Sequence, residues 1–139
     1  MKATLTWQGN RDLDLAAYWR HGEERGLVYY GDVGDRSRAP WIELTADDDG
    51  SDGENVEELI ISRPQGTIWL LCWDAARVDA AEAGPIEADL ALDDHQVSID
   101  GRGNLAILGV LREGVFTPRP QVHTITGLQH IDTLEALLA

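Results

Sequence analysis

Hydrophobic and polar residues alternate along much of the chain, and this period of two is typical of half-buried β-strands. The alternation is clearest in residues 2–7 and again from Leu13 to Trp19. Residues 67–73 are instead almost continuously apolar, which predicts a central strand that is covered on both faces. Further short strands are expected at 27–30, 41–44, 56–61, 85–92, 95–99 and 105–111, and around 115 and 122–125.

The segments between these strands are rich in turn-forming residues. Residues 21–26 are polar and predict a turn, whereas residues 45–55 have no periodic apolar pattern and predict a loop. Asp100-Gly101 is a strong signal for a hairpin turn. Many short strands that recur roughly every ten residues, with turns between them, indicate an antiparallel β-sandwich.

Only the C-terminal tail changes to helical spacing. Its apolar residues recur with the period of a helix: Leu128, Ile131, Leu134 and Leu138. Thr126 and Gln129 fit a capping box ahead of them. The chain has 139 residues, which suits one domain with a single core. We therefore predict one all-β domain over residues 1–139, an antiparallel β-sandwich with a short C-terminal helix.

The chain is strongly acidic, with 25 Asp and Glu against 11 Lys and Arg and a formal net charge of −14. Such a field repels nucleic acids and anionic membrane surfaces, so we expect no nucleic-acid partner. No apolar run approaches the ~20 residues that a membrane-spanning helix needs, so we also expect no membrane insertion. The charge favours cations, basic partners or simple solubility, and by itself it does not choose among them.

Cys72 is the only cysteine, and it lies in an apolar segment where a thiol behaves as a small hydrophobic side chain. A single cysteine excludes an intramolecular disulfide. The chain does not begin with a basic region followed by an apolar stretch, as a secretory signal would. These features predict a buried thiol and a cytoplasmic location.

The acidic residues are concentrated in one short segment. Between residues 43 and 58 there are eight of them and no basic residue: Glu43, Asp47, Asp48, Asp49, Asp52, Glu54, Glu57 and Glu58. A further pair, Asp12 and Asp14, stands on one face of an early strand. Neighbouring carboxylates repel one another by roughly 1 kcal/mol per close pair even in water. Either a cation offsets this repulsion or the segment is a solvated, self-repelling loop.

A hard divalent cation suits such a segment. Calcium takes about six to eight oxygen ligands and tolerates irregular geometry. Gly50 and Gly53 allow the backbone to bend so that its carbonyl oxygens also point inward. Oxygen ligands without neighbouring His or Cys disfavour zinc, and the four histidines are scattered along the chain. The segment is not an EF-hand, because alignment on either glycine leaves an apolar residue where the loop needs its final acid.

Short motifs in a fixed order extend over nearly the whole chain. Residues 5–7 read Leu-Thr-Trp and are followed by Asp-Leu-Asp-Leu at residues 12–15. The later motifs are residues 29–31, 39–44, 57–61, 104–111 and 127–128. This series resembles the tellurium-resistance domains of the TerD/TerA family, and especially its TerA-like branch.

The resemblance implies a cytoplasmic, calcium-binding β-sandwich that is not an enzyme. It also implies an association with tellurite and other stress resistance, through other proteins of a stress-response assembly. The calcium ligands that it implies are Asp12, Asp14, Asp47, Asp48, Asp52, Glu54, Glu57 and Glu58. Residues 53–57 depart from the family pattern, because they read Gly-Glu-Asn-Val-Glu where TerD-type members have Gly-Asp-Gly-Asp-Asp. One acid is missing, so the number of calcium ions stays open.

Catalytic and sugar-binding functions are the alternatives. Asp12 and Asp14 do not follow the strongly apolar strand that precedes the nucleophile of aspartate-based phosphatases. The chain has no Gly-x-Ser-x-Gly elbow and no sign of the opposed carboxylates of glycosidases, so we expect no catalytic residue. Trp69 and Trp73 share strand parity, and an exposed aromatic face would favour a metal-independent carbohydrate- or protein-binding module. Core packing is the more ordinary role of tryptophan.

Overall fold

The computed structural model describes the whole chain except residues 10, 47–52, 75–83, 126–130 and 139. The described residues form ten strands and one helix. They are β1 (Lys2–Gln8), β2 (Leu13–His21), β3 (Glu24–Val28), β4 (Ile42–Ala46), β5 (Glu54–Ile61), β6 (Thr67–Asp74), β7 (Gly84–Leu92), β8 (His95–Gly103), β9 (Leu105–Arg112), β10 (Val115–His123) and α1 (Ile131–Leu138).

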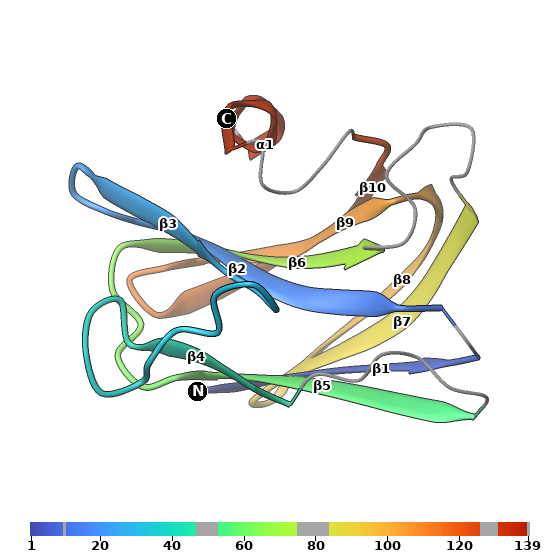
Figure 1. Cartoon of the computed structure of the whole chain (residues 1–139), viewed down its shortest axis with the longest axis horizontal. Helices are drawn as coiled ribbons and strands as arrows, with labels where there is room; N and C mark the ends of the chain where they lie inside the picture. The colour runs from blue at the N-terminus through green and yellow to red at the C-terminus, as the bar shows by residue number, and fades with distance from the viewer. Residues whose placement is uncertain (10, 47–52, 75–83, 126–130, 139) are drawn as a thin grey trace.

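The strands form two five-stranded sheets that lie face to face (Figure 1). Sheet A has the order β4-β5-β1-β7-β8, and sheet B has the order β10-β9-β6-β2-β3. Every neighbouring pair is antiparallel. The predicted fold class, an antiparallel β-sandwich with a short C-terminal helix, is therefore confirmed. The predicted central strand is confirmed as well, because β6 is buried in the middle of sheet B.

The core between the sheets follows from the alternation of residues along the strands. In β1, Ala3, Leu5 and Trp7 are buried, whereas Thr4 and Thr6 on the opposite face are only half-buried. Burying one large aliphatic side chain contributes about 1.5–3 kcal/mol. A shift of one residue would turn all of these side chains outward, so the pattern fixes which face of each strand points to the core.

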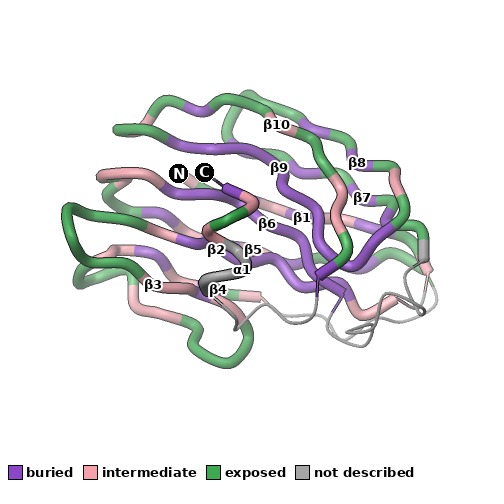
Figure 2. The backbone as a smooth tube through the Cα atoms, turned by 90° about the horizontal axis from the view of Figure 1, so that it is seen from above, coloured by how far each residue is buried: buried purple, intermediate pink, exposed green. Residues whose placement is uncertain are grey.

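A second apolar layer covers the outer face of sheet B. Tyr18, Trp69 and Trp73 lie in this layer and pack with Ile125 and with Leu138 of α1. The helix lies over this face of the sheet (Figures 1 and 2). Trp69 and Trp73 are only 6% and 2% exposed, so the aromatic face that sugar binding would need is part of a core.

No described helix is long and apolar enough to span a membrane.

Glu135 fastens α1 to sheet B. Its carboxylate accepts hydrogen bonds from the Tyr18 hydroxyl and the Arg25 guanidinium. The bond from Tyr18, followed by the one from Arg25, lowers the pKa of Glu135. Burial, followed by the bond to Glu135, raises the pKa of the Tyr18 hydroxyl, so the donor stays protonated and the acceptor stays ionised at neutral pH. The predicted capping residues Thr126 and Gln129 lie outside the described residues.

We expect the hydrogen bonds that Glu135 accepts to weaken in acid. The folded-state pKa of Glu135 lies below its unfolded value of about 4.3. Its stabilising contribution is therefore complete above that value and is lost as the pH falls through the folded-state pKa. Between about pH 6 and about pH 3, the thermal midpoint of Glu135→Gln should fall less than that of the unmodified chain. Glu23→Gln, on an exposed turn, should behave like the unmodified chain, and equal responses of all three proteins would contradict the prediction.

The hairpin turn predicted at Asp100-Gly101 is wrong. β8 continues through both residues to Gly103 and stays paired with β7. A Cβ atom at Gly101 would lie 2.7 Å from Val122 Cγ2, and one at Gly103 would lie 2.3 Å from the His123 carbonyl oxygen. These glycines therefore allow β8 and β10 to approach closely, and they do not reverse the chain.

Several strands are longer than predicted, because they continue into polar residues. β2 and β3 take up all of the turn predicted at 21–26 except residues 22 and 23. β4 takes the first two residues of the loop predicted at 45–55, and β5 takes the last two. β10 is a single strand with a shift in register between Pro118 and Gln121, where one or two short pieces were predicted. Backbone pairing does not require a buried side chain, so the hydrophobic pattern does not mark these residues.

Candidate functional site

Polar side chains from several strands gather at one end of the sandwich. At this end, on the right in Figure 1, β1 and β6 finish while β2 and β5 begin. The register places Leu13 of β2 opposite Asp74 of β6, and Gln8 of β1 opposite Glu54 of β5. We refer to the following group as the acidic end: Arg11, Asp12, Asp14, Asn55, Glu57 and Asp74.

Glu57 is a buried carboxylate between the two sheets. It lies on the inner face of β5 and is 0% exposed. Its Oε1 accepts a hydrogen bond of 2.8 Å from the backbone N–H of Leu15. Because β5 belongs to sheet A and β2 belongs to sheet B, this bond joins the sheets. A buried charge is costly unless it is compensated, so Glu57 occupies a position that a simple sandwich would fill with an apolar residue.

Glu54 and Glu58 lie on the opposite face of β5 from Glu57, because successive side chains of a strand point to opposite faces. The Glu58 carboxylate lies 3.0 Å from Lys2 Nζ and accepts a hydrogen bond of 2.9 Å from the Thr45 hydroxyl. These two contacts, the one with Lys2 first, lower the pKa of Glu58. Glu54 and Glu58 therefore do not converge with Glu57, although they are close to it in sequence.

Arg11 brings a positive charge to the acidic end. Its Nε donates a hydrogen bond of 2.9 Å to Asp74 Oδ2, and an Nη nitrogen donates to the same oxygen. The Asp74 side chain is only 1% exposed. The Trp7 indole N–H donates to the Arg11 carbonyl oxygen at 2.8 Å and so holds the backbone of this residue near the end of β1. The guanidinium and the carboxylate cancel one another, so the pair adds no net charge to the acidic end.

Asn55 holds the turn between β1 and β2 against the beginning of β5. Its side-chain N–H groups donate to the carbonyl oxygens of Gly9 at 2.7 Å and Gly53 at 3.3 Å. The Gly9 N–H in turn donates to the Gly53 carbonyl oxygen at 3.0 Å. Both glycines have positive φ angles, 96° and 104°, which other residues rarely adopt. These bonds bring the segment that carries Asp12 and Asp14 next to the strand that carries Glu57.

The buried charges act on one thiol, that of Cys72. Its pKa is raised because burial disfavours the thiolate, and because the charges of Glu57, Asp14 and Asp74 repel it, in that order. Arg11 acts in the opposite direction. Asp14 is itself only 3% exposed. The thiol is buried, as predicted.

The eight predicted calcium ligands fall into three sets: members of the acidic end, residues on the outer face of sheet A, and residues outside the described part of the chain. In this order, the sets are Asp12, Asp14 and Glu57; Glu54 and Glu58; and Asp47, Asp48 and Asp52. Among the described residues, no three His, Cys, Asp or Glu side chains form a group that could hold a metal ion.

Three members of the acidic end were not among the predicted site residues: Arg11, Asn55 and Asp74. The sequence carried a weak signal for two of them. Asp74 directly follows a continuous apolar strand, and Asn55 lies close behind a glycine in an acidic segment. Their partners are 63 and 46 positions away along the chain, so local patterns could not reveal these contacts.

The fold and this end of it define a class of protein, an antiparallel β-sandwich with a carboxylate-rich end and a short helix packed on one sheet. Comparisons of the chain with models of protein families, with curated proteins and with solved structures find no match. The likeness to TerD/TerA domains therefore rests on the sequence motifs.

Proposed function

We propose that this chain is a calcium-binding β-sandwich module of the TerD/TerA type, which contributes to resistance to tellurite and other chemical stress through protein partners. One observation carries the proposal. The turn that leads to Asp12 and Asp14 is tied by Asn55 to β5, the strand that carries Glu57. The acidic segment 47–52 precedes the same strand in the sequence. The segment with Asp12 and Asp14 thus lies next to a strand with a buried carboxylate, although the two are far apart in sequence.

Calcium suits the chemistry of this end. Carboxylate, amide and backbone carbonyl oxygens are hard donors, which calcium prefers over sulfur and nitrogen ligands. The double positive charge would offset repulsion among the carboxylates. Binding to the folded state alone would also stabilise the fold by mass action. The metal would then fix the surface that the acidic end presents to a partner.

Calcium titration of chelator-treated protein tests the proposal. We expect a Kd below about 1 mM, which is the weak limit of protein calcium sites. At a calcium concentration of about 100 times the Kd, the free energy of unfolding should rise by about 2.7 kcal/mol. Asp12→Asn/Asp14→Asn should weaken binding by about tenfold or more, because two charged oxygen ligands are lost. Isothermal titration calorimetry and urea denaturation with and without calcium measure these effects.

A matched control distinguishes the loss of calcium ligands from an equal change in net charge elsewhere on the surface. Glu23→Gln/Glu24→Gln removes the same charge from the exposed turn after β2 and the exposed first residue of β3 and should leave the Kd unchanged. Asp47→Asn/Asp52→Asn should act like the change at Asp12 and Asp14. The proposal fails if the unmodified chain does not bind calcium below about 1 mM, or if the control weakens binding as much as the ligand variants do.

A further inference from the structure

The outer face of sheet A differs from that of sheet B. The helix α1 covers sheet B, whereas no described element covers the outer face of sheet A. Two adjoining hollows of about 520 Å³ and 310 Å³ lie on this open face, and Thr6 and Asp89 line both of them. We refer to these two hollows together as the groove.

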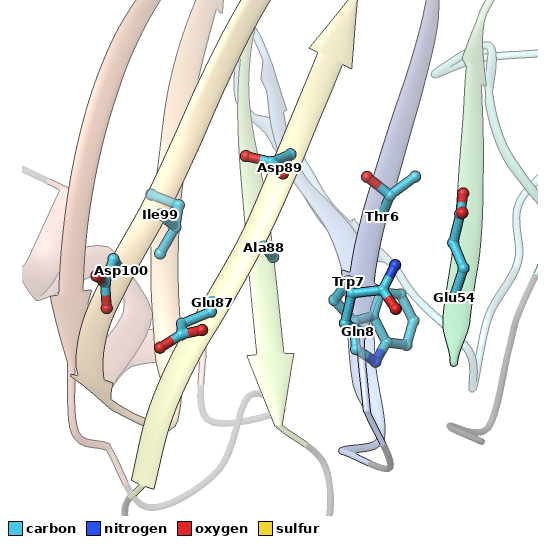
Figure 3. A pocket seen from close by; sticks show the side chains of 9 residues that line it. All are labelled: Thr6, Trp7, Gln8, Glu54, Glu87, Ala88, Asp89, Ile99 and Asp100. Carbon is cyan, nitrogen blue, oxygen red and sulfur yellow. The ribbon is translucent and has the colours of Figure 1, made fainter. Parts of the chain in front are cut away.

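Figure 3 shows the larger hollow and the side chains that project into it. The polar ones come from four neighbouring strands: Glu54 of β5, Thr6 and Gln8 of β1, Glu87 and Asp89 of β7, and Asp100 of β8. The described residues that line this hollow include four carboxylates and no basic side chain. The groove therefore attracts cations.

The strand register increases the repulsion within the groove. Glu87 stands directly opposite Asp100 across β7 and β8, and like charges in this position destabilise a sheet. Asp89 differs, because it accepts a hydrogen bond of 2.7 Å from the Ser98 hydroxyl. A positively charged ligand that lies over Glu87 and Asp100 would relieve their repulsion.

The spacing of the carboxylates distinguishes a single ion from a longer ligand. Three strand spacings separate β5 from β8 in sheet A, and at about 4.8 Å each they span about 14 Å. One metal ion reaches oxygen ligands at only about 2.3–2.6 Å, so it cannot engage Glu54 and Asp100 together. About four residues of an extended peptide cover the same distance, at about 3.3 Å per residue. Lysine and arginine side chains on such a segment would meet successive carboxylates.

We propose that the outer face of sheet A is a docking surface for a basic segment of a partner protein. Charge complementarity selects the ligand, and the arginine fork adds geometric fit because it binds carboxylates through two parallel hydrogen bonds. The groove is distinct from the acidic end, whose buried members lie between the sheets or on sheet B. The proposal does not depend on calcium binding.

Fluorescence anisotropy with a labelled hexa-arginine peptide tests this surface, with the full chain kept in excess chelator. Glu87→Gln/Asp100→Asn should weaken binding by about tenfold, because two charge-assisted contacts are lost. Glu23→Gln/Glu24→Gln lowers the net charge equally at an exposed site away from the groove and should change the Kd by less than about twofold. Both variants alter exposed side chains, and thermal unfolding checks that each remains folded.

Three results would overturn the proposal. Equal weakening in both variants would mean that the peptide responds only to the net charge of −14. Unchanged binding in Glu87→Gln/Asp100→Asn would place the peptide elsewhere. Loss of calcium affinity in the same variant would make the hollow a metal site. Because the peptide assay contains chelator, its result does not depend on whether the chain binds calcium. The calcium titration contains no peptide, so its result does not depend on peptide binding.

Discussion

Arg11→Met is expected to lower the free energy of unfolding by about 3–5 kcal/mol, because it takes a guanidinium away from a buried carboxylate. Two nitrogens of Arg11 donate to Asp74 Oδ2, and the Asp74 side chain is 1% exposed. An exposed ion pair contributes only about 0–1 kcal/mol. The larger loss arises because the desolvated carboxylate remains when its positive partner is removed. Urea denaturation followed by tryptophan fluorescence measures this change.

Two further variants separate the ion pair from the general effect of losing an arginine. Arg11→Met/Asp74→Asn should recover much of the lost stability, because a neutral amide is less costly to bury than a carboxylate. Arg112→Met, at the exposed end of β9, should change stability by no more than about 0.5 kcal/mol. The explanation is wrong if Arg11→Met loses less than about 1 kcal/mol, the value of an exposed pair, or if the double variant is less stable than the single one.

The hydrophobic pattern was sufficient for the fold class, because each strand buries one face or both. The same pattern also distinguishes neighbouring acids. Glu57 shares the parity of Leu59 and Ile61, which are buried on the inner face of β5, whereas Glu58 has the opposite parity. The period of two in the sequence therefore assigns Glu57 and Glu58 to different faces of the strand. The prediction that both residues are calcium ligands did not use this difference.

The contacts of the acidic end could not be predicted, because they depend on which strands become neighbours. Alternation indicates which face of a strand is buried but not its partner or its register. Asp74 meets Arg11 only because β6 pairs with β2 in sheet B. The wrong prediction of a turn at Gly101 has a similar origin. Its turn signal was local, whereas the close approach of Val122 that requires a glycine there is long-range.

Asn104→Ala is expected to lower the free energy of unfolding by about 2–4 kcal/mol, because it leaves two backbone groups of Ile125 without partners. The Asn104 side chain is fully buried between β8 and β9. Its N–H donates to the Ile125 carbonyl oxygen, and its Oδ1 accepts from the Ile125 N–H at 2.7 Å. Ile125 packs with Leu138 of α1, so this amide holds the chain that leads to the helix. Chemical denaturation measures the loss in stability.

Asn104→Asp tests whether the amide acts through both of its atoms. A carboxylate still accepts from the Ile125 N–H, but when ionised it has no proton to give to the Ile125 carbonyl oxygen. Burial and this carbonyl favour the protonated acid, so the folded-state pKa of the new carboxyl should lie above its unfolded value of about 3.9. The free energy of unfolding of the variant should therefore be closest to that of the unmodified chain below about pH 3.9. It should fall as the pH rises from there towards the folded-state pKa. A deficit that does not depend on pH would mean that only the bond from the Ile125 N–H matters.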